Sequence, residues 1–181
     1  MNISVVIPAF NSQESLPHLV ERLKPVLDAI SQAYELILVN DGSRDRTWEV
    51  ISELARKNPW IRGLNLMRNY GQHNALLAGI RAARHEVVVT MDDDLQHPPE
   101  EIPLLLKKLR EGFDVVYGTP EKMRHDLFRN LSSKATKWVM KTALGAMTAP
   151  DISAFRAFHT RIREAFDRFE GPRVSIDVLL T

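Results

Sequence analysis

The stretch VVVTMDDDLQHPPE, residues 87–100, predicts a buried strand that runs directly into three aspartates and then into a helix. Four successive β-branched residues at 87–90 favour a strand covered on both faces, because no polar residue alternates with them. The following prolines and glutamates at 98–101 suit the first turn of a helix, where proline needs no N–H partner and acids complement the helix dipole. The stretch therefore has the order strand, polar loop, helix.

The same order recurs along the chain. The apolar runs are ISVVIP, ELILVN, IRGLNLM, EVVVTM and FDVVYG, and helical patterns cover residues 13–31, 45–57, 72–83 and 99–110 between them. Short apolar strands that alternate with helices are typical of βαβ units and a parallel sheet. We therefore expect an α/β fold with a mostly parallel central sheet and helices on both faces.

Composition narrows the class of protein. The 181 residues are 44% hydrophobic, which is enough for one globular domain with a sizeable core. The 24 Lys and Arg nearly balance 23 Asp and Glu, so the overall charge predicts no nucleic-acid binding. The absence of cysteine excludes a disulfide framework, a thiolate zinc site and a thiol nucleophile. With no basic leader before an apolar stretch, and no run of about 18 apolar residues, we expect this piece to be soluble.

Polar residues follow three of the predicted strands. They form the segments PAFNSQES at 8–15, NDGSRD at 40–45 and DDDLQH at 92–97. Ligands of open α/β sheets bind at the carboxyl ends of the strands, so these segments are the candidate binding loops. Neither G-x-G-x-x-G after the first strand nor G-x-x-x-x-G-K-[ST] occurs, so a phosphate must be bound in another way.

The three aspartates suggest how a phosphate could be bound. In an extended backbone Asp92 and Asp94 would point to one side and Asp93 to the other. Two converging carboxylates raise each other's pKa unless a divalent cation keeps both ionised. Mg²⁺ and Mn²⁺ favour such oxygen ligands and leave positions for phosphate oxygens. The spacing therefore predicts a site for Mg²⁺ or Mn²⁺ and a diphosphate, with the Gln96 amide oxygen on the same side.

Simpler interpretations stay open for the same residues. Acidic loops are common at strand ends, and an aspartate here could cap the following helix. His73 and His97 are left out of the metal set, because no other histidine lies at metal-ligand spacing. Asp41 is either a turn-forming residue or a hydrogen-bond acceptor for a base or ribose.

Six motifs in order resemble a known enzyme family. They are VVIPAFN, LILVNDGS, RNYGQHNALLAG, VVVTMDDDLQHPPEEIP, FDVVYGT and SAFRAF, and they span nearly the whole chain. The sequence resembles family 2 glycosyltransferases with a GT-A fold, in the branch that transfers sugars to polyprenyl phosphate. Within that branch it is similar to the undecaprenyl-phosphate 4-deoxy-4-formamido-arabinose transferases and bactoprenol glucosyltransferases, and more distantly to dolichyl-phosphate mannose synthases.

The resemblance implies an inverting, metal-dependent enzyme. Its expected partners are a nucleoside-diphosphate sugar, most simply UDP-linked, a polyprenyl-phosphate acceptor and a membrane surface, and self-association stays open. Relatives continue into two carboxy-terminal membrane spans, whereas this sequence stops within RVSIDVLLT, which predicts a truncated catalytic domain at the cytoplasmic face of a bacterial inner membrane. Residues 1–118 would then form the nucleotide-sugar and metal half, and residues 119–181 the acceptor half.

The resemblance also implies roles for individual residues. The nucleotide loops would comprise Pro8, Ala9, Phe10, Asn11, Glu14 and Asp41, together with Arg68, Asn69, Tyr70, Gly71 and Gln72. The family's D-x-D stretch falls on Asp92, Asp93 and Asp94, with Asp94 and Gln96 foremost as metal ligands and Asp92 next.

Cations in the later part of the chain would bind the donor and acceptor phosphates. The candidates are Arg124, Arg129 and Arg156, because an arginine fork pairs well with phosphate oxygens. Many relatives have Gly-Ser-Arg where Gly118-Thr119-Pro120 stands here, so Arg124 is expected to supply the missing charge. Asp151 is the nearby carboxylate for a base or an orienting role, although an anionic phosphate acceptor needs no base.

Residues 120–163 are strongly basic. They contain nine Lys or Arg against three acids, and DLFRNLSSKATKWVMKTALG at 126–145 has an apolar and a lysine-rich helical face. Such a helix either lies on anionic lipid or packs on the sheet with its lysines in water. The rival functions are a nucleotidyltransferase, a glycosyltransferase that acts on a sugar hydroxyl in polysaccharide or cell-wall synthesis, and a non-catalytic nucleotide-binding module at the membrane surface.

Overall fold

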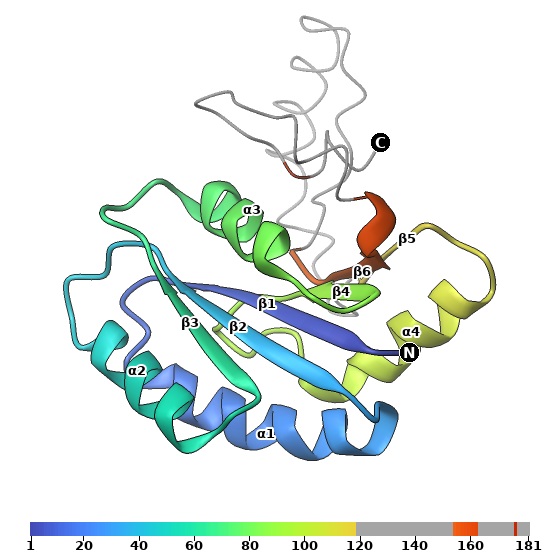
Figure 1. Cartoon of the computed structure of the whole chain (residues 1–181), viewed down its shortest axis with the longest axis horizontal. Helices are drawn as coiled ribbons and strands as arrows, with labels where there is room; N and C mark the ends of the chain where they lie inside the picture. Colours follow the sequence, from blue (N-terminus) through green and yellow to red (C-terminus); the bar gives the residue numbers. More distant parts are fainter. Residues whose placement is uncertain (119–153, 163–175, 177–181) are drawn as a thin grey trace, which may run out of the picture.

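The computed structural model of the chain describes residues 1–118, 154–162 and 176. Their central feature is a six-stranded sheet with strand order β3-β2-β1-β4-β6-β5 (Figure 1). Helices cover both faces of this sheet. The α/β architecture with a mostly parallel sheet is therefore confirmed.

The four parallel strands are those predicted from apolar runs. They are β1 (Ile3–Ala9), β2 (Tyr34–Asn40), β3 (Ile61–Asn65) and β4 (Val87–Thr90). The register pairs the last residues of the first three strands, since Ala9 lies opposite Asn40 and Asn40 lies opposite Asn65. The loops after these strands therefore start at the same edge of the sheet.

Of the remaining two strands, β5 (Val115–Tyr117) runs in the same direction as β1–β4, and β6 (Arg156–His159) runs in the opposite direction. The sequence predicted β5, but β6 was not predicted. This strand inserts between β4 and β5 and runs antiparallel to both, with Arg156 opposite Thr90. Its four residues are too few to show a strand period, so the motif SAFRAF did not indicate it.

Within residues 1–118, three helices cover one face of the sheet and one helix covers the other. On the first face lie α1 (Ser15–Ile30), α2 (Thr47–Lys57) and α4 (Ile102–Arg110), the last preceded by the 3₁₀ turn η1 (Pro99–Glu101). On the second face α3 (Gln72–Ala82) lies across β1 and β2. Among the described helices, none combines the length and apolar character needed to cross a bilayer.

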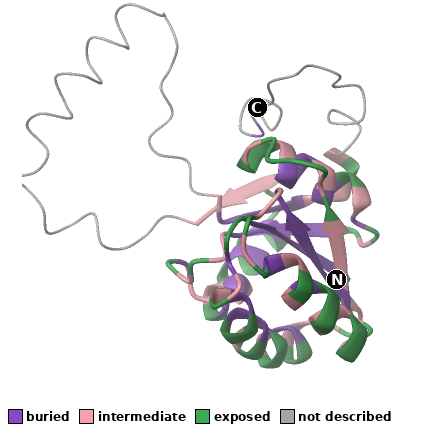
Figure 2. Ribbon diagram, turned by 90° about the vertical axis from the view of Figure 1, so that its left-hand side faces the viewer, coloured by how far each residue is buried: buried purple, intermediate pink, exposed green. Residues whose placement is uncertain are grey.

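The core has two parts, one on each side of the sheet (Figure 2). Ile3, Val5 and Ile7 of β1 point to the side of α1, whereas Val6 points to α3. Gly79 of α3 lies so close that an added Cβ would meet a Val6 methyl at 2.3 Å. The glycine thus lets α3 approach β1, which places the start of α3 at the edge where the loops gather.

Glu35 is a buried carboxylate at the start of β2, at the edge opposite these loops. It accepts hydrogen bonds from the Ser4 hydroxyl at 2.8 Å, Arg62 Nη1 at 2.7 Å and the Arg84 N–H at 2.7 Å. Burial alone would raise the pKa of Glu35, but the hydrogen bonds from Arg62, Ser4 and Arg84 outweigh it, and the pKa is lowered. The ionised form of Glu35 therefore stabilises the folded state.

The variant Glu35→Gln is expected to lose about 1–3 kcal/mol of unfolding free energy at pH 7, because a charge-assisted set of hydrogen bonds is lost. Because the pKa of Glu35 is lower in the folded state than its ordinary value of 4.5, the ionised carboxylate stabilises the fold above pH 4.5. This stabilisation is lost as the pH falls through the folded pKa. Urea unfolding at pH 7 and below pH 4 measures this, and the difference between wild type and variant should shrink in acid.

The control variant is Glu53→Gln, which removes an exposed i,i+4 pair with Lys57. Exposed pairs contribute little, so its stability should match that of wild type at both pH values. A difference for Glu35→Gln that stays constant with pH would contradict the assigned role of the charge.

Candidate functional site

A pocket of about 360 Å³ opens at the carboxyl edge of the parallel strands. Its lining residues are Pro8, Ala9, Phe10, Asp41, Asn69, Gly71, Gln72, Asp92, Asp93 and Asp94. These come from the ends of β1, β2 and β4, from the turn before α3 and from the first residue of α3. The structure therefore brings the three predicted loops and the segment before α3 to one cavity.

The loop after β1 is joined to the loop after β2 by backbone-to-side-chain hydrogen bonds. The Asn11 N–H donates to Ser43 Oγ at 3.0 Å, and Asn11 Oδ1 accepts the Arg44 N–H at 2.9 Å. The Ser12 N–H donates to Thr47 Oγ1 at 2.7 Å. Asn11 thus holds the second loop in place, which explains its left-handed backbone with φ 57°. The hydrogen bonds therefore join the two loops into one unit.

Asp41 fixes the segment before α3. Its side chain is 3% exposed, and its two oxygens accept the backbone N–H groups of Tyr70 at 2.7 Å and Gly71 at 2.9 Å. Asp41 thus shapes the loop before α3 and also lines the pocket, and its role as an acceptor for a base or ribose stays a prediction. A carboxylate has about four acceptor sites, so capacity for a ligand N–H remains.

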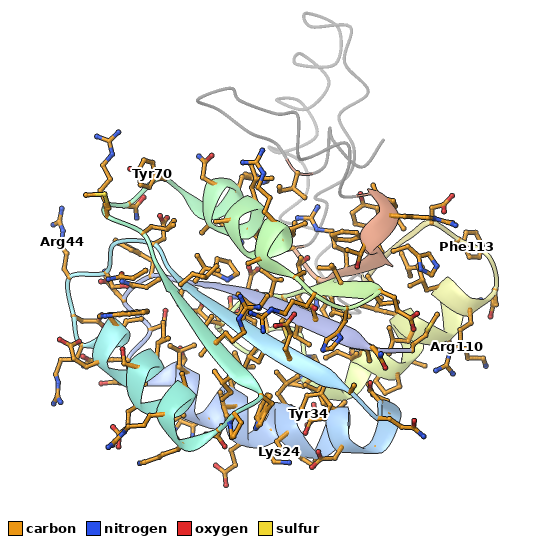
Figure 3. All side chains as sticks on the ribbon, in the orientation of Figure 1. Lys24, Tyr34, Arg44, Tyr70, Arg110 and Phe113 are labelled. Atoms are coloured by element: carbon orange, nitrogen blue, oxygen red, sulfur yellow. The ribbon has the colours of Figure 1, made fainter. Side chains whose placement is uncertain are left out.

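The outer part of this segment is exposed. The Arg68 guanidinium lies over the Tyr70 ring at 4.9 Å, and Tyr70 is 45% exposed. Figure 3 shows Tyr70 and Arg44 at the same end of the molecule, pointing outwards. Arg68 and Tyr70 lie outside the pocket lining, and so do Asn11 and the exposed Glu14.

The acidic segment differs from the expected extended form. Strand β4 ends at Thr90, and the backbone bends from Asp93, with Leu95 in the left-handed region at φ 60°. Asp92, Asp93 and Asp94 all line the pocket, and the extended backbone that placed Asp93 on the opposite side is not what the structure shows. The alternation failed because it holds within a strand, whereas these residues follow the strand.

The electrostatics of the acidic segment match a cluster of like charges. Burial raises the pKa of Asp92, and the carboxylates of Asp94 and Asp93 raise it further, against the influence of His97 and Arg156. Burial also raises the pKa of Asp93, although a hydrogen bond from the Ser12 side chain opposes this shift. A cation in the pocket would lower the free energy of this arrangement.

The described residues contain no group of three His, Cys, Asp or Glu side chains arranged to hold a metal ion. A nucleotide-bound Mg²⁺ or Mn²⁺ does not need such a group, because one or two carboxylates suffice when phosphate oxygens and water complete the shell. Asp92 and Asp94 in one pocket fit that requirement. The Gln96 N–H donates to Asp94 Oδ1 at 3.0 Å, but Gln96 is not among the lining residues, and its role as a ligand stays a prediction.

Arg156 and His97 are buried residues outside the pocket lining. Arg156 is 1% exposed; its Nε donates to Thr90 Oγ1 at 3.2 Å, and its guanidinium lies 5.9 Å from the centre of the Tyr117 ring. His97 is buried and stacks on Phe155 with ring centres 5.0 Å apart. Arg156 therefore approaches the acidic segment from within the fold, beside Thr90 at the end of β4.

Three predicted site residues, Arg124, Arg129 and Asp151, lie outside the described residues, and so does the basic stretch at 126–145. Sequence reasoning missed Ser12 and Thr47, whose contacts hold the loops together. Small hydroxyl residues in the loop segments were visible in the sequence, but nothing there indicated which backbone groups they would meet.

Comparison with known proteins places the chain in a family context. Residues 4–169 match the family model described as Glycosyl transferase family 2. A protein from Pectobacterium atrosepticum called undecaprenyl-phosphate 4-deoxy-4-formamido-L-arabinose transferase is 42% identical over 98% of this chain and 55% of its own length. A protein of the same name from Photorhabdus laumondii is 42% identical over 90% of this chain and 50% of its own length. The chain thus spans about half the length of these relatives.

Solved structures share the fold. Glucosyl-3-phosphoglycerate synthase from Mycobacterium tuberculosis, in complex with Mn²⁺, UDP and phosphoglyceric acid, has a TM-score of 0.65 at 23% identity, over 91% of this chain and 57% of that one. The mannosyltransferase PcManGT from Pyrobaculum calidifontis, in complex with GDP-mannose and Mn²⁺, has a TM-score of 0.64 at 20% identity, over 93% of this chain and 46% of that one. These likenesses confirm the GT-A fold expected from the sequence.

Proposed function

The chain belongs to glycosyl transferase family 2, and we propose that it is the catalytic domain of an inverting, metal-dependent enzyme acting on a nucleoside-diphosphate sugar. The acceptor we propose is a polyprenyl phosphate. The observation that carries the proposal is the single pocket that Asp41 and the three aspartates of the acidic segment share. Such a pocket offers hydrogen-bond acceptors at one end and a cation-attracting cluster at the other.

Each end of the pocket suits one part of the donor. Asp41 and the partly exposed Phe10 ring offer an acceptor and an apolar surface for a base. Asp92 and Asp94 would hold Mg²⁺ or Mn²⁺, which when bound neutralises charge on the leaving diphosphate. UDP is our first choice of nucleotide, in keeping with the UDP complex of the mycobacterial synthase.

The reaction we propose is a direct displacement. An anionic oxygen of the acceptor phosphate attacks the anomeric carbon, the bond from that carbon to the diphosphate oxygen breaks, and the nucleoside diphosphate leaves. Attack from the opposite side inverts the anomeric configuration. The acceptor oxygen carries no proton to remove near neutral pH, so the chain's own residues need to bind and orient the two substrates rather than supply a base.

The lipid acceptor is supported by the named activity of the relatives at 42% identity. It is also supported by the basic composition of residues 120–163, which suits a phosphate acceptor at an anionic membrane surface. We accordingly propose that the domain works at the cytoplasmic face of the bacterial inner membrane.

Calorimetric titration of the chain with UDP, GDP and CDP, with Mn²⁺ and then with EDTA, tests the donor half of the proposal. We expect UDP to bind in Mn²⁺ and to bind at least about tenfold more weakly after the metal is removed, since the diphosphate then meets uncompensated carboxylates. Equal binding with and without Mn²⁺ would contradict the metal role, and preference for GDP or CDP would replace UDP as the donor nucleotide.

A further inference from the structure

Gln72 connects the two ends of the pocket. It is the first residue of α3, and its side-chain Nε2 donates a hydrogen bond to Asp92 Oδ1 at 2.5 Å. The residue just before it, Gly71, donates its N–H to Asp41 at 2.9 Å. One continuous run of contacts therefore leads from Asp41 through the start of α3 to the acidic segment.

The backbone of Gln72 is held firmly on both sides. Before it, Asp41 binds the N–H groups of Tyr70 and Gly71. After it, Ala75 and Ile80 are buried in the core between α3 and the sheet. The amide donor of Gln72 consequently starts from a fixed point, so its hydrogen bond restricts the orientation of the Asp92 carboxylate.

The side-chain amide of Gln72 is a hydrogen-bond donor that suits a carboxylate holding a cation. A lysine or arginine in the same place would neutralise Asp92 and compete with a metal ion, whereas an amide orients the carboxylate without adding charge. Gln72 occupies Oδ1 of Asp92, so the other oxygen is left to meet a ligand. Carboxylates that bind metal are commonly oriented by such neighbouring hydrogen bonds.

We infer that Gln72 is a positioning residue that orients Asp92 for a divalent cation. The inference rests on the proposed function, because that function requires the cation. It goes further by assigning Gln72 to Asp92, whereas the resemblance to the family places it in the donor loop. It also explains how the segment that Asp41 fixes reaches the metal end of the pocket.

The test is Mn²⁺ affinity in the absence of nucleotide, measured from the electron paramagnetic resonance signal of free Mn²⁺. The variant is Gln72→Met, which keeps the length and helix preference of the side chain but removes the donor. We expect Mn²⁺ to bind about 10-fold more weakly to the variant than to wild type, at the lower end of the 10–100-fold effect of losing such a partner.

Two control variants separate this role from general damage. Gln32→Met makes the same change at an exposed site near the amino end of β2, and Asn74→Ala removes another amide from the first turn of α3, one that donates to the Tyr70 carbonyl at 2.7 Å. Both should bind Mn²⁺, and UDP in EDTA, as wild type does.

The inference is overturned if Gln72→Met binds Mn²⁺ as tightly as wild type, or if wild type binds no Mn²⁺. It is also overturned if Gln72→Met weakens UDP binding in EDTA, because Gln72 would then contact the nucleotide instead of positioning Asp92. A wild type that binds Mn²⁺ but no nucleoside diphosphate would contradict the proposed function alone, and the comparison of Mn²⁺ affinities would still decide the role of Gln72.

Discussion

Replacing Asp94 with alanine is expected to abolish the strengthening of UDP binding by Mn²⁺. Asp94 is exposed within the pocket, and its Oδ1 is oriented by the Gln96 N–H at 3.0 Å. If Asp94 is a direct ligand, as we propose, its removal should weaken the Mn²⁺-dependent binding by more than about 100-fold, the upper end of the range for indirect partners. Calorimetric titration of the variant with UDP, in Mn²⁺ and in EDTA, measures the change.

Binding of UDP in EDTA shows whether Asp94 favours or opposes nucleotide binding when no metal is present. Without metal, Asp94 adds negative charge next to the site proposed for a diphosphate, so Asp94→Ala should bind UDP in EDTA no more weakly than wild type does. Glu21→Ala is the matched control, since it removes an exposed carboxylate on α1 outside the pocket. A variant Asp94→Ala that keeps the Mn²⁺ dependence would show that the ion is held elsewhere.

The strands and helices of the first 118 residues could be predicted because each carries its own local pattern. Apolar runs mark β1 to β4, and the intervening helices carry apolar faces. Strand β6 could not be predicted in this way, because its place is set by pairing with β4 and β5 rather than by its four residues. Partners distant in sequence decide such a strand, and no local pattern records them.

The location of the site was predictable for a related reason. The carboxyl ends of parallel strands meet at one edge, so three polar loops had to converge there. The contacts within the site were not predictable, because they depend on the path of each loop. Asp41 illustrates this limit: its pocket position follows from β2, but its hydrogen bonds to Tyr70 and Gly71 follow from a turn that the sequence left undefined.

Asp93 illustrates the same limit within the acidic segment. A strand period placed its side chain away from Asp92 and Asp94, but the strand stops earlier and the backbone bends. Leu95 takes a left-handed conformation that a branched side chain rarely adopts. Conformations of this kind are retained where the surrounding structure enforces them, often at functional sites, which agrees with a segment shaped to present carboxylates.

Gly42→Ala is expected to disrupt both the loop 68–71 and nucleotide binding. A Cβ on Gly42 would lie 2.4 Å from Arg68 C and 2.4 Å from Asn69 N, and these backbone atoms cannot yield as a flexible side chain would. Gly42 also has φ +65°, which costs a non-glycine residue additional free energy. Together the two effects should lower the free energy of unfolding by about 2–5 kcal/mol.

Gly112→Ala separates these two effects. Gly112 has φ +104°, but nothing lies within 4 Å of an added Cβ, and the residue is remote from the pocket. This variant should lose about 1–2 kcal/mol and bind UDP as wild type does. Urea unfolding and UDP calorimetry of both variants make the comparison. If Gly42→Ala also binds UDP normally, the packing of the 41–42 turn against the 68–71 loop is not what shapes the pocket. Selective loss of binding would instead show that the packing of the 41–42 turn against the 68–71 loop shapes the pocket.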